Sequence, residues 1–109
     1  MTTTSVEQKK LLINGEWRTA TGGKTMPVVN PATEAVIAEV ASADKADVDA
    51  AVAAARAALA GPWGKMSARD RGRLVWKLAE RLMERADEIA RLETLHNGKP
   101  ISESRQGEI

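Results

Sequence analysis

The chain has 109 residues, a formal net charge of +1 and no cysteine. This length allows one small domain at most, and the nearly balanced charge leaves no global field to attract nucleic acid or acidic lipid. Without cysteine, the sequence excludes disulfides and thiolate metal sites. It also holds no run of about 18 apolar residues and no secretory signal, so we expect a cytoplasmic protein without a membrane span.

The first part of the sequence predicts short strands joined by turns. Residues 1–9 are polar and are expected to form a disordered N-terminal arm. Asn14-Gly15 lies between two strand-like runs and favours a hairpin, because both turn residues need positive φ. Further strands are expected over residues 25–29, where Pro27 restricts the segment to an edge, and over residues 35–40, where side chains alternate between two faces. These segments predict a short antiparallel β-meander.

The second part switches to helical periodicity. Residues 44–60 predict a helix whose start is marked by Asp44, with Asp47 three residues on, and which stops at Gly61-Pro62. Residues 67–100 predict one long amphipathic helix of about 45 Å, with Ser67 as its N-cap and with Asn97-Gly98 supplying the left-handed residue that ends it. One face of this helix is apolar, and it comprises Leu74, Val75, Leu78, Leu82, Ala86, Ile89 and Leu92. The last nine residues resemble the beginning of a further helix.

Four short segments occur in the order and spacing of one protein family. They are LINGEW (Leu12–Trp17), VNPAT (Val29–Thr33), VDAAV (Val48–Val52) and LETLHNGKP (Leu92–Pro100). Together they resemble the N-terminal region of the aldehyde dehydrogenase superfamily, over residues 10–109. The resemblance implies an α/β protein of which this chain is an α+β part. A β-meander and two helices would belong to a larger Rossmann-like fold that is incomplete at Ile109.

The resemblance also implies an activity that this chain does not complete. Family members are NAD- or NADP-dependent oxidoreductases that oxidise an aldehyde to a carboxylic acid through a thiohemiacetal on a cysteine. This chain has no cysteine, so we expect no catalytic or cofactor-binding residue in it and no activity from it alone. The implied partners are the remainder of the polypeptide, the aldehyde and further copies in a dimer or tetramer, but neither nucleic acid nor membrane. The alternative is a free-standing helical protein-interaction module without catalysis.

One candidate binding site follows from the resemblance. Some family members hold a monovalent cation with backbone carbonyls just before Asn-Pro and with an acidic side chain. Val28 and Val29 occupy the carbonyl positions, and His96 stands where the acidic residue occurs. An imidazole nitrogen is a poor substitute for an oxygen ligand around a hard cation, so only the carbonyls are expected to remain. Without the family resemblance, His96 is interpreted as a helix-end residue, which is favourable near the negative end of the helix dipole.

Three other features have ordinary structural readings. The pair Gly22-Gly23 indicates a turn, because no strand-to-helix transition follows it to hold a phosphate. A basic patch is expected on the surface or against an acidic partner, and it comprises Lys65, Arg69, Arg71, Arg73 and Lys77. Glu93 lies within the apolar arc, and either it is solvated at the helix end or it bonds a backbone segment.

Overall fold

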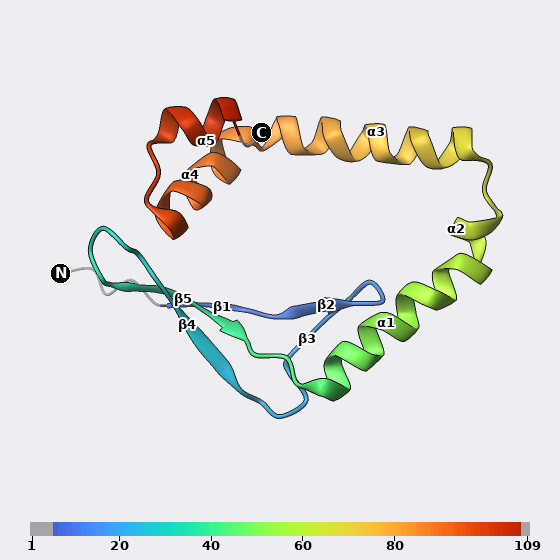
Figure 1. Ribbon diagram of the computed structural model, residues 1–109, viewed down its shortest axis with the longest axis horizontal. Coiled ribbons are helices and arrows are strands. Elements are labelled where there is room, and N and C mark those ends of the chain that lie inside the picture. The colour runs from blue at the N-terminus through green and yellow to red at the C-terminus, as the bar shows by residue number, and fades with distance from the viewer. Residues whose placement is uncertain (1–5, 108–109) are drawn as a thin grey trace. The chain divides into compact units, whose positions relative to one another are not determined.

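The computed structural model describes residues 6–107 and shows an α+β chain (Figure 1). These residues form two compact units. The first unit holds the chain up to Val29 together with Val36–Lys65, and the second holds Asn30–Ala35 with the chain from Met66 onward. Within residues 6–107, none of the helices has the length and apolar character needed to cross a bilayer.

The first unit contains five strands in two sheets. They are β1 (Glu7–Lys9), β2 (Leu11–Ile13), β3 (Glu16–Arg18), β4 (Thr25–Val29) and β5 (Val36–Ala41). β2 and β3 form an antiparallel hairpin of their own, whereas β5 lies between β1 and β4 in a three-stranded sheet (Figure 1). The pairing of β4 with β5 is antiparallel, but that of β1 with β5 is parallel. The predicted antiparallel meander is therefore wrong in its connectivity.

The difference begins at Glu7–Lys9, which the sequence analysis included in the disordered arm. Because β2 and β3 pair with each other, one edge of β5 is left open, and β1 pairs with that edge through its backbone. Backbone pairing does not depend on apolar side chains, so the polar sequence gave no signal for this strand. Residues 1–5 of the predicted arm lie outside the described residues.

Two local predictions for the strands are confirmed. Asn14 and Gly15 have φ values of 53° and 75°, as a tight hairpin turn requires. β4, which contains Pro27, is an edge strand of its sheet. The pairing of β4 with β5 changes register between Val28 and Val29, which marks a β-bulge at the end of the strand.

The predicted first helix is confirmed as α1 (Lys45–Ala60), which contacts β2. The helix begins with a capping box, in which the side chains of Asp44 and Asp47 each accept a backbone N–H of the other residue. It ends at Gly61, and a short helix, α2 (Pro62–Lys65), follows at once. Pro62 occupies the first position of α2, where the missing N–H costs nothing.

The second unit contains three helices, and the prediction of one helix over residues 67–100 is wrong. Ser67 caps α3 (Ala68–Glu84) as predicted, but Arg85 leaves helical geometry with φ −111° and ψ 18°, and α4 (Ala86–Asn97) starts after it. No Gly or Pro marks this break in the sequence. The break is accompanied by a new set of contacts, because α4 packs on α5 (Ile101–Gly107), the further helix expected from the sequence (Figure 1).

The interior of the second unit lies between α4 and α5. Ala90 and Ser104 are fully buried there, and the Oγ1 of Thr94 lies 2.9 Å from the Oγ of Ser104. Gly98 ends α4 in the left-handed conformation at φ 81°, as the sequence predicted. By contrast, the leucines of α3 are largely exposed. We refer to Leu74, Leu78 and Leu82 as the leucine face, and their exposed fractions are 41%, 58% and 45%.

Candidate functional site

Asp47 is the buried centre of a hydrogen-bonded cluster in the first unit. Its side chain is 1% exposed, although it carries a carboxylate. Arg18, the last residue of β3, donates to its Oδ1 at 2.9 Å. Thr21 donates its hydroxyl at 2.6 Å and its backbone N–H at 3.1 Å, and the N–H of Asp44 donates at 3.0 Å. The cluster therefore ties the end of the hairpin to the first turn of α1.

This environment fixes the charge state of Asp47. The hydroxyl of Thr21, the N–H of Asp44 and the guanidinium of Arg18 hold the pKa of Asp47 well below its usual range, although burial acts in the opposite direction. A carboxylate that stays ionised and has its oxygens occupied by protein donors has little capacity to transfer protons. The cluster is therefore a structural clamp and does not provide a general acid or base.

The predicted cation ligands lie at the end of β4, where its pairing with β5 shifts register. Val28 pairs with Ala38, and Val29 pairs with Val36, so one residue of β5 is passed over between them. In a regular strand, consecutive carbonyls point toward opposite edges of the strand and would not converge on one ion. The residue passed over, Ile37, belongs to β5, so the register shift lies beside the two predicted ligands and its extra residue is in the partner strand.

His96 and Glu93 lie on the last turns of α4, in the second unit. His96 is exposed. Glu93 is partly buried, accepts a hydrogen bond from the side-chain amide of Asn97 and lies 3.8 Å from the ammonium group of Lys99. The sequence predicts Glu93 to be either solvated at the helix end or bonded to a backbone segment. Neither interpretation describes it fully, because it is partly buried and its partners are polar side chains. Residues 6–107 contain no group of three or more His, Cys, Asp or Glu side chains that could hold a metal ion.

The glycine pair is a turn, as predicted. Gly23 has φ 70°, and its N–H donates to the carbonyl of Ala20 at 2.8 Å. The pair connects β3 to β4, so no helix N-terminus follows it. Nothing in this geometry fits the pyrophosphate of a dinucleotide, and we assign no cofactor contact to Gly22 or Gly23.

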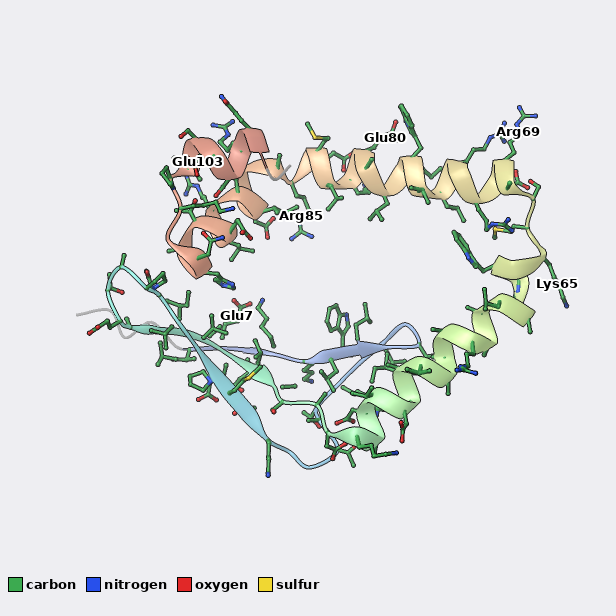
Figure 2. The ribbon with its side chains drawn as sticks, in the orientation of Figure 1. Glu7, Lys65, Arg69, Glu80, Arg85 and Glu103 are labelled. Atoms are coloured by element: carbon green, nitrogen blue, oxygen red, sulfur yellow. The ribbon has the colours of Figure 1, made fainter. Side chains whose placement is uncertain are left out.

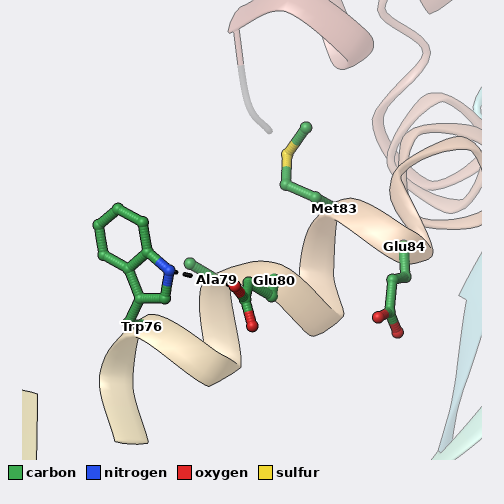
Figure 3. Close-up of a pocket in the computed structure, with 5 residues that line it drawn as sticks. All are labelled: Trp76, Ala79, Glu80, Met83 and Glu84. Atoms are coloured by element: carbon green, nitrogen blue, oxygen red, sulfur yellow. Dashed lines mark hydrogen bonds between the residues drawn. The ribbon is translucent and has the colours of Figure 1, made fainter. Parts of the chain in front are cut away.

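The charges of the second unit pair partly as expected. Arg85 bonds Glu88 at 2.7 Å, the helix-surface pair that their spacing predicts. Asp87 stands four residues before Arg91 on the same helix, a spacing that also allows an ion pair, yet it bonds Arg105 of α5 at 2.9 Å. This contact between helices could not be expected while α4 was taken as part of one long rod. On α3, an open groove is lined by Trp76, Ala79, Glu80, Met83 and Glu84 (Figure 3).

Comparison with known proteins decides the family. The sequence pattern described as "Aldehyde dehydrogenase family" matches residues 17–109. The chain belongs to the aldehyde dehydrogenase family. The mitochondrial aldehyde dehydrogenase of Equus caballus is 53% identical over 93 residues, which are 84% of this chain and 19% of that protein. Cytosolic aldehyde dehydrogenase 1 of Elephantulus edwardii is 46% identical over 101 residues, covering 91% of this chain and 20% of that protein.

Solved structures agree with this aldehyde dehydrogenase fold. The structure of the Bacillus cereus aldehyde dehydrogenase in complex with NAD+ superimposes with a TM-score of 0.90 at 47% identity, over 93% of this chain and 21% of that chain. Betaine aldehyde dehydrogenase from Staphylococcus aureus gives 0.85 at 36% identity, over 89% of this chain and 20% of that one. The chain thus spans about a fifth of the length of the relatives it matches. A free-standing interaction module is not favoured.

Sequence reasoning missed the residues that organise this aldehyde dehydrogenase segment. It identified Asp47 only as part of a helix start, and the spacing of Asp44 and Asp47 was the one local signal. The other partners of Asp47, Arg18 and Thr21, lie 29 and 26 residues away in the chain, so no local pattern connects them. The buried pair Thr94 and Ser104 was missed for the same reason.

Proposed function

We propose that this chain is the N-terminal structural part of an NAD(P)-dependent aldehyde dehydrogenase. The whole enzyme would oxidise an aldehyde to a carboxylic acid through a thiohemiacetal on a cysteine in the remainder of the polypeptide. One observation carries this proposal. Residues 17–109 match the family, yet the match is about a fifth of its relatives and includes no cysteine that could act as nucleophile.

The role proposed for the segment is to frame the cofactor-binding domain. The leucine face supports it, because three half-exposed leucines in one row favour burial against another surface, at about 25 cal/mol for each Å² of apolar area removed from water. Under this proposal residues 10–109 belong to one larger domain, and the remainder of the polypeptide covers the leucine face. NAD or NADP, when bound, accepts the hydride, and the residues that hold it would lie outside this chain.

Other features of the whole protein follow as parts of the same proposal. We propose a cytoplasmic homo-oligomer, a dimer or tetramer, whose substrate is an aldehyde. Relatives include both cytosolic and mitochondrial proteins, so the family alone leaves the compartment open. Since the charge is nearly balanced, we propose neither nucleic acid nor a membrane as a partner.

We further propose that the carbonyls of Val28 and Val29 contribute to a monovalent cation site in the whole enzyme. Their position at the end of β4 supports this assignment, because the regular pairing of β4 with β5 is interrupted there by a register shift. The ion would have oxygen ligands from the backbone and none from residue 96, since His96 carries no oxygen in its side chain. Such an ion would stabilise the folded enzyme without taking part in hydride transfer.

An activity assay tests the enzymatic proposal. The 109-residue chain and a longer polypeptide from the same reading frame are each incubated with NAD or NADP and a panel of aldehydes, and nicotinamide absorbance is followed. We expect turnover only from the longer polypeptide, and we expect it to disappear when the cysteine aligned with the family nucleophile is replaced by alanine. A longer polypeptide that folds but oxidises no aldehyde would contradict the proposal.

A further inference from the structure

α3 carries a second patterned face that is distinct from the leucine face. At about 100° per residue, four charged residues and one tryptophan fall within an arc of about 80° on the opposite side of the helix. Figure 2 shows two of them, Arg69 and Glu80, projecting from the same side of α3. All five are exposed, and Trp76 is 68% exposed. We call this set the charged face, and it comprises Arg69, Arg73, Trp76, Glu80 and Glu84.

The charges on this face are arranged symmetrically along the helix. Two arginines four residues apart stand toward the N-terminus, and two glutamates four residues apart stand toward the C-terminus. The midpoint between Arg69 and Glu84 falls between Trp76 and Lys77, and so does the midpoint between Arg73 and Glu80. If a second copy of α3 lies antiparallel about that midpoint, Arg69 of one copy faces Glu84 of the other, and Arg73 faces Glu80. A two-fold axis then makes each pairing twice, which is the self-complementary contact that a symmetric dimer requires.

The spacing of these charges is partly unfavourable for α3 on its own. Arg69 and Arg73 are like charges at i and i+4, and Glu80 and Glu84 repeat this spacing, although Arg81 offsets part of the repulsion by pairing with Glu84 at 3.2 Å. The positive pair also stands near the positive end of the helix dipole, and the negative pair stands near the negative end. A helix that runs in the opposite direction reverses both effects, because it brings opposite charges and the opposite end of its dipole to each pair.

The centre of the charged face has the composition of an interface core. The indole Nε1 of Trp76 donates to the Oε1 of Glu80 at 3.2 Å, so the ring is held along the helix surface (Figure 3). Ala79 and Met83 line the groove beside it, and Met83 is 63% exposed. Tryptophan at the middle of a contact, surrounded by charged residues, is the usual arrangement of a binding hot spot.

We propose that the charged face of α3 binds the same face of a second copy of this chain in an antiparallel, two-fold symmetric contact. Trp76 lies beside its own symmetry mate at the centre, and the arginine–glutamate pairs close the contact at both ends. The proposal needs neither aldehyde nor nucleotide, so it stands or falls separately from the enzymatic assignment. It commits to a second copy because the charge pattern is complementary to itself when reversed.

Four versions of the 109-residue chain test the proposal by sedimentation equilibrium, with circular dichroism to verify that each remains helical. They are the natural chain, the variant Arg69→Glu/Arg73→Glu, the variant Glu80→Arg/Glu84→Arg, and the variant with all four substitutions. Each double variant places like charges against each other, so its self-association should weaken at least about tenfold. The variant with all four substitutions restores a charge pattern that is complementary to itself when reversed, so it should dimerise again. An equimolar mixture of the two double variants should form a heterodimer.

The variant with all four substitutions is the decisive control, because its charges agree with the helix dipole. Circular dichroism verifies that α3 persists without the Arg81–Glu84 ion pair and the Trp76–Glu80 hydrogen bond. Self-association that is the same in all four proteins would mean that the leucine face drives it, which overturns the proposal. A natural chain that stays monomeric at every concentration also overturns it. Trp76→Ala should weaken the natural dimer without removing its dependence on salt.

Discussion

The hydroxyl of Thr21 donates to the carboxylate of Asp47 at 2.6 Å across 26 residues of sequence. The N–H of Thr21 donates to both oxygens of the same carboxylate, at 3.2 and 3.1 Å. One residue therefore holds the start of α1 by its backbone and by its side chain. Since the buried apolar residues of the described chain are the small side chains of Ala20, Ala38 and Ala90, such a polar clamp carries a large share of the local order.

Replacing the buried carboxylate should destabilise the first unit. We expect Asp47→Asn to lower the melting temperature by several degrees, because an amide cannot accept all the hydrogen bonds that Thr21, Asp44 and Arg18 donate. The matched control is Asp49→Asn on the same helix, where an exposed carboxylate bonds Lys45 at 2.7 Å. Thermal melts of both variants at neutral pH make the comparison, and equal small shifts would show that the clamp contributes nothing.

The loss of stability caused by Asp47→Asn should depend on pH. The pKa of Asp47 is lowered in the folded protein, chiefly by the Thr21 hydroxyl, so the folded state favours its ionised form. Its contribution is present above the pKa of an unfolded aspartate, about 4, and is lost as pH falls toward the lower folded value. The gap in melting temperature between the natural chain and Asp47→Asn should therefore narrow below pH about 4. A gap that stays constant down to the acid limit of the fold would contradict this assignment.

The hydroxyl groups of Thr94 and Ser104, which meet between α4 and α5, should contribute unequally to the stability of the protein. Thr94→Val leaves the fully buried Ser104 hydroxyl without its partner, which costs about 1–3 kcal/mol. Ser104→Ala should cost less, because Thr94 is only partly buried and water can replace the lost bond. The double variant should be more stable than Thr94→Val alone. Urea unfolding of the four proteins measures the cycle, and strictly additive losses would show that the two hydroxyls are not coupled.

The turn residues and helix caps were the most predictable part of the fold. Asn14-Gly15, Gly98 and Ser67 act through their own backbone or their near neighbours, so their sequence alone indicates what they do. The break at Arg85 could not be predicted, because no residue there disfavours a helix and the contacts that accompany it come from α5. Likewise, β1 depends on an edge of β5 that is open only because β2 and β3 pair together.

The candidate sites also divide into features that a local sequence signal indicates and features that depend on tertiary contacts. Family resemblance suggested Val28 and Val29 as cation ligands, which stays a prediction, and only the pairing of β4 with β5 reveals the register shift beside them. The partners of Asp47 and the pairing of Thr94 with Ser104 arise from tertiary contacts, so no local sequence pattern predicts them. In physical terms, a local sequence pattern indicates the backbone conformation of its own residues. Polar contacts between residues far apart in the chain leave no such pattern.

Gly98 should tolerate no side chain. It adopts φ 81°, and a methyl group on its Cα would lie 3.2 Å from the Cγ of Pro31. We expect Gly98→Ala to cost about 1–2 kcal/mol from the left-handed conformation, with the contact to Pro31 adding to the loss. The control is Gly107→Ala, where the added methyl group meets nothing within 4 Å. If urea unfolding finds the two variants equally stable, the end of α4 is not held as the structure shows.

The cation proposal is tested through residue 96 in the full-length enzyme. His96→Asp should give a larger rise in melting temperature on exchanging choline for potassium at matched ionic strength, because a carboxylate oxygen is a suitable ligand for a hard cation. His96→Asn is the control that adds an oxygen without a charge. An equal potassium response in the natural enzyme and the Asp variant, or none in either, would leave His96 a helix-end residue with no part in a cation site.

The central claim, that this chain is a structural part of an aldehyde dehydrogenase and lacks its chemistry, is tested most directly by complementation. The 109-residue chain is mixed with a separately produced polypeptide that begins after Ile109 in the same reading frame, and NAD-dependent aldehyde oxidation is followed. The account predicts no activity from either piece alone and measurable activity from the mixture. Turnover by the 109-residue chain alone, or full activity of the second piece without it, would contradict the account.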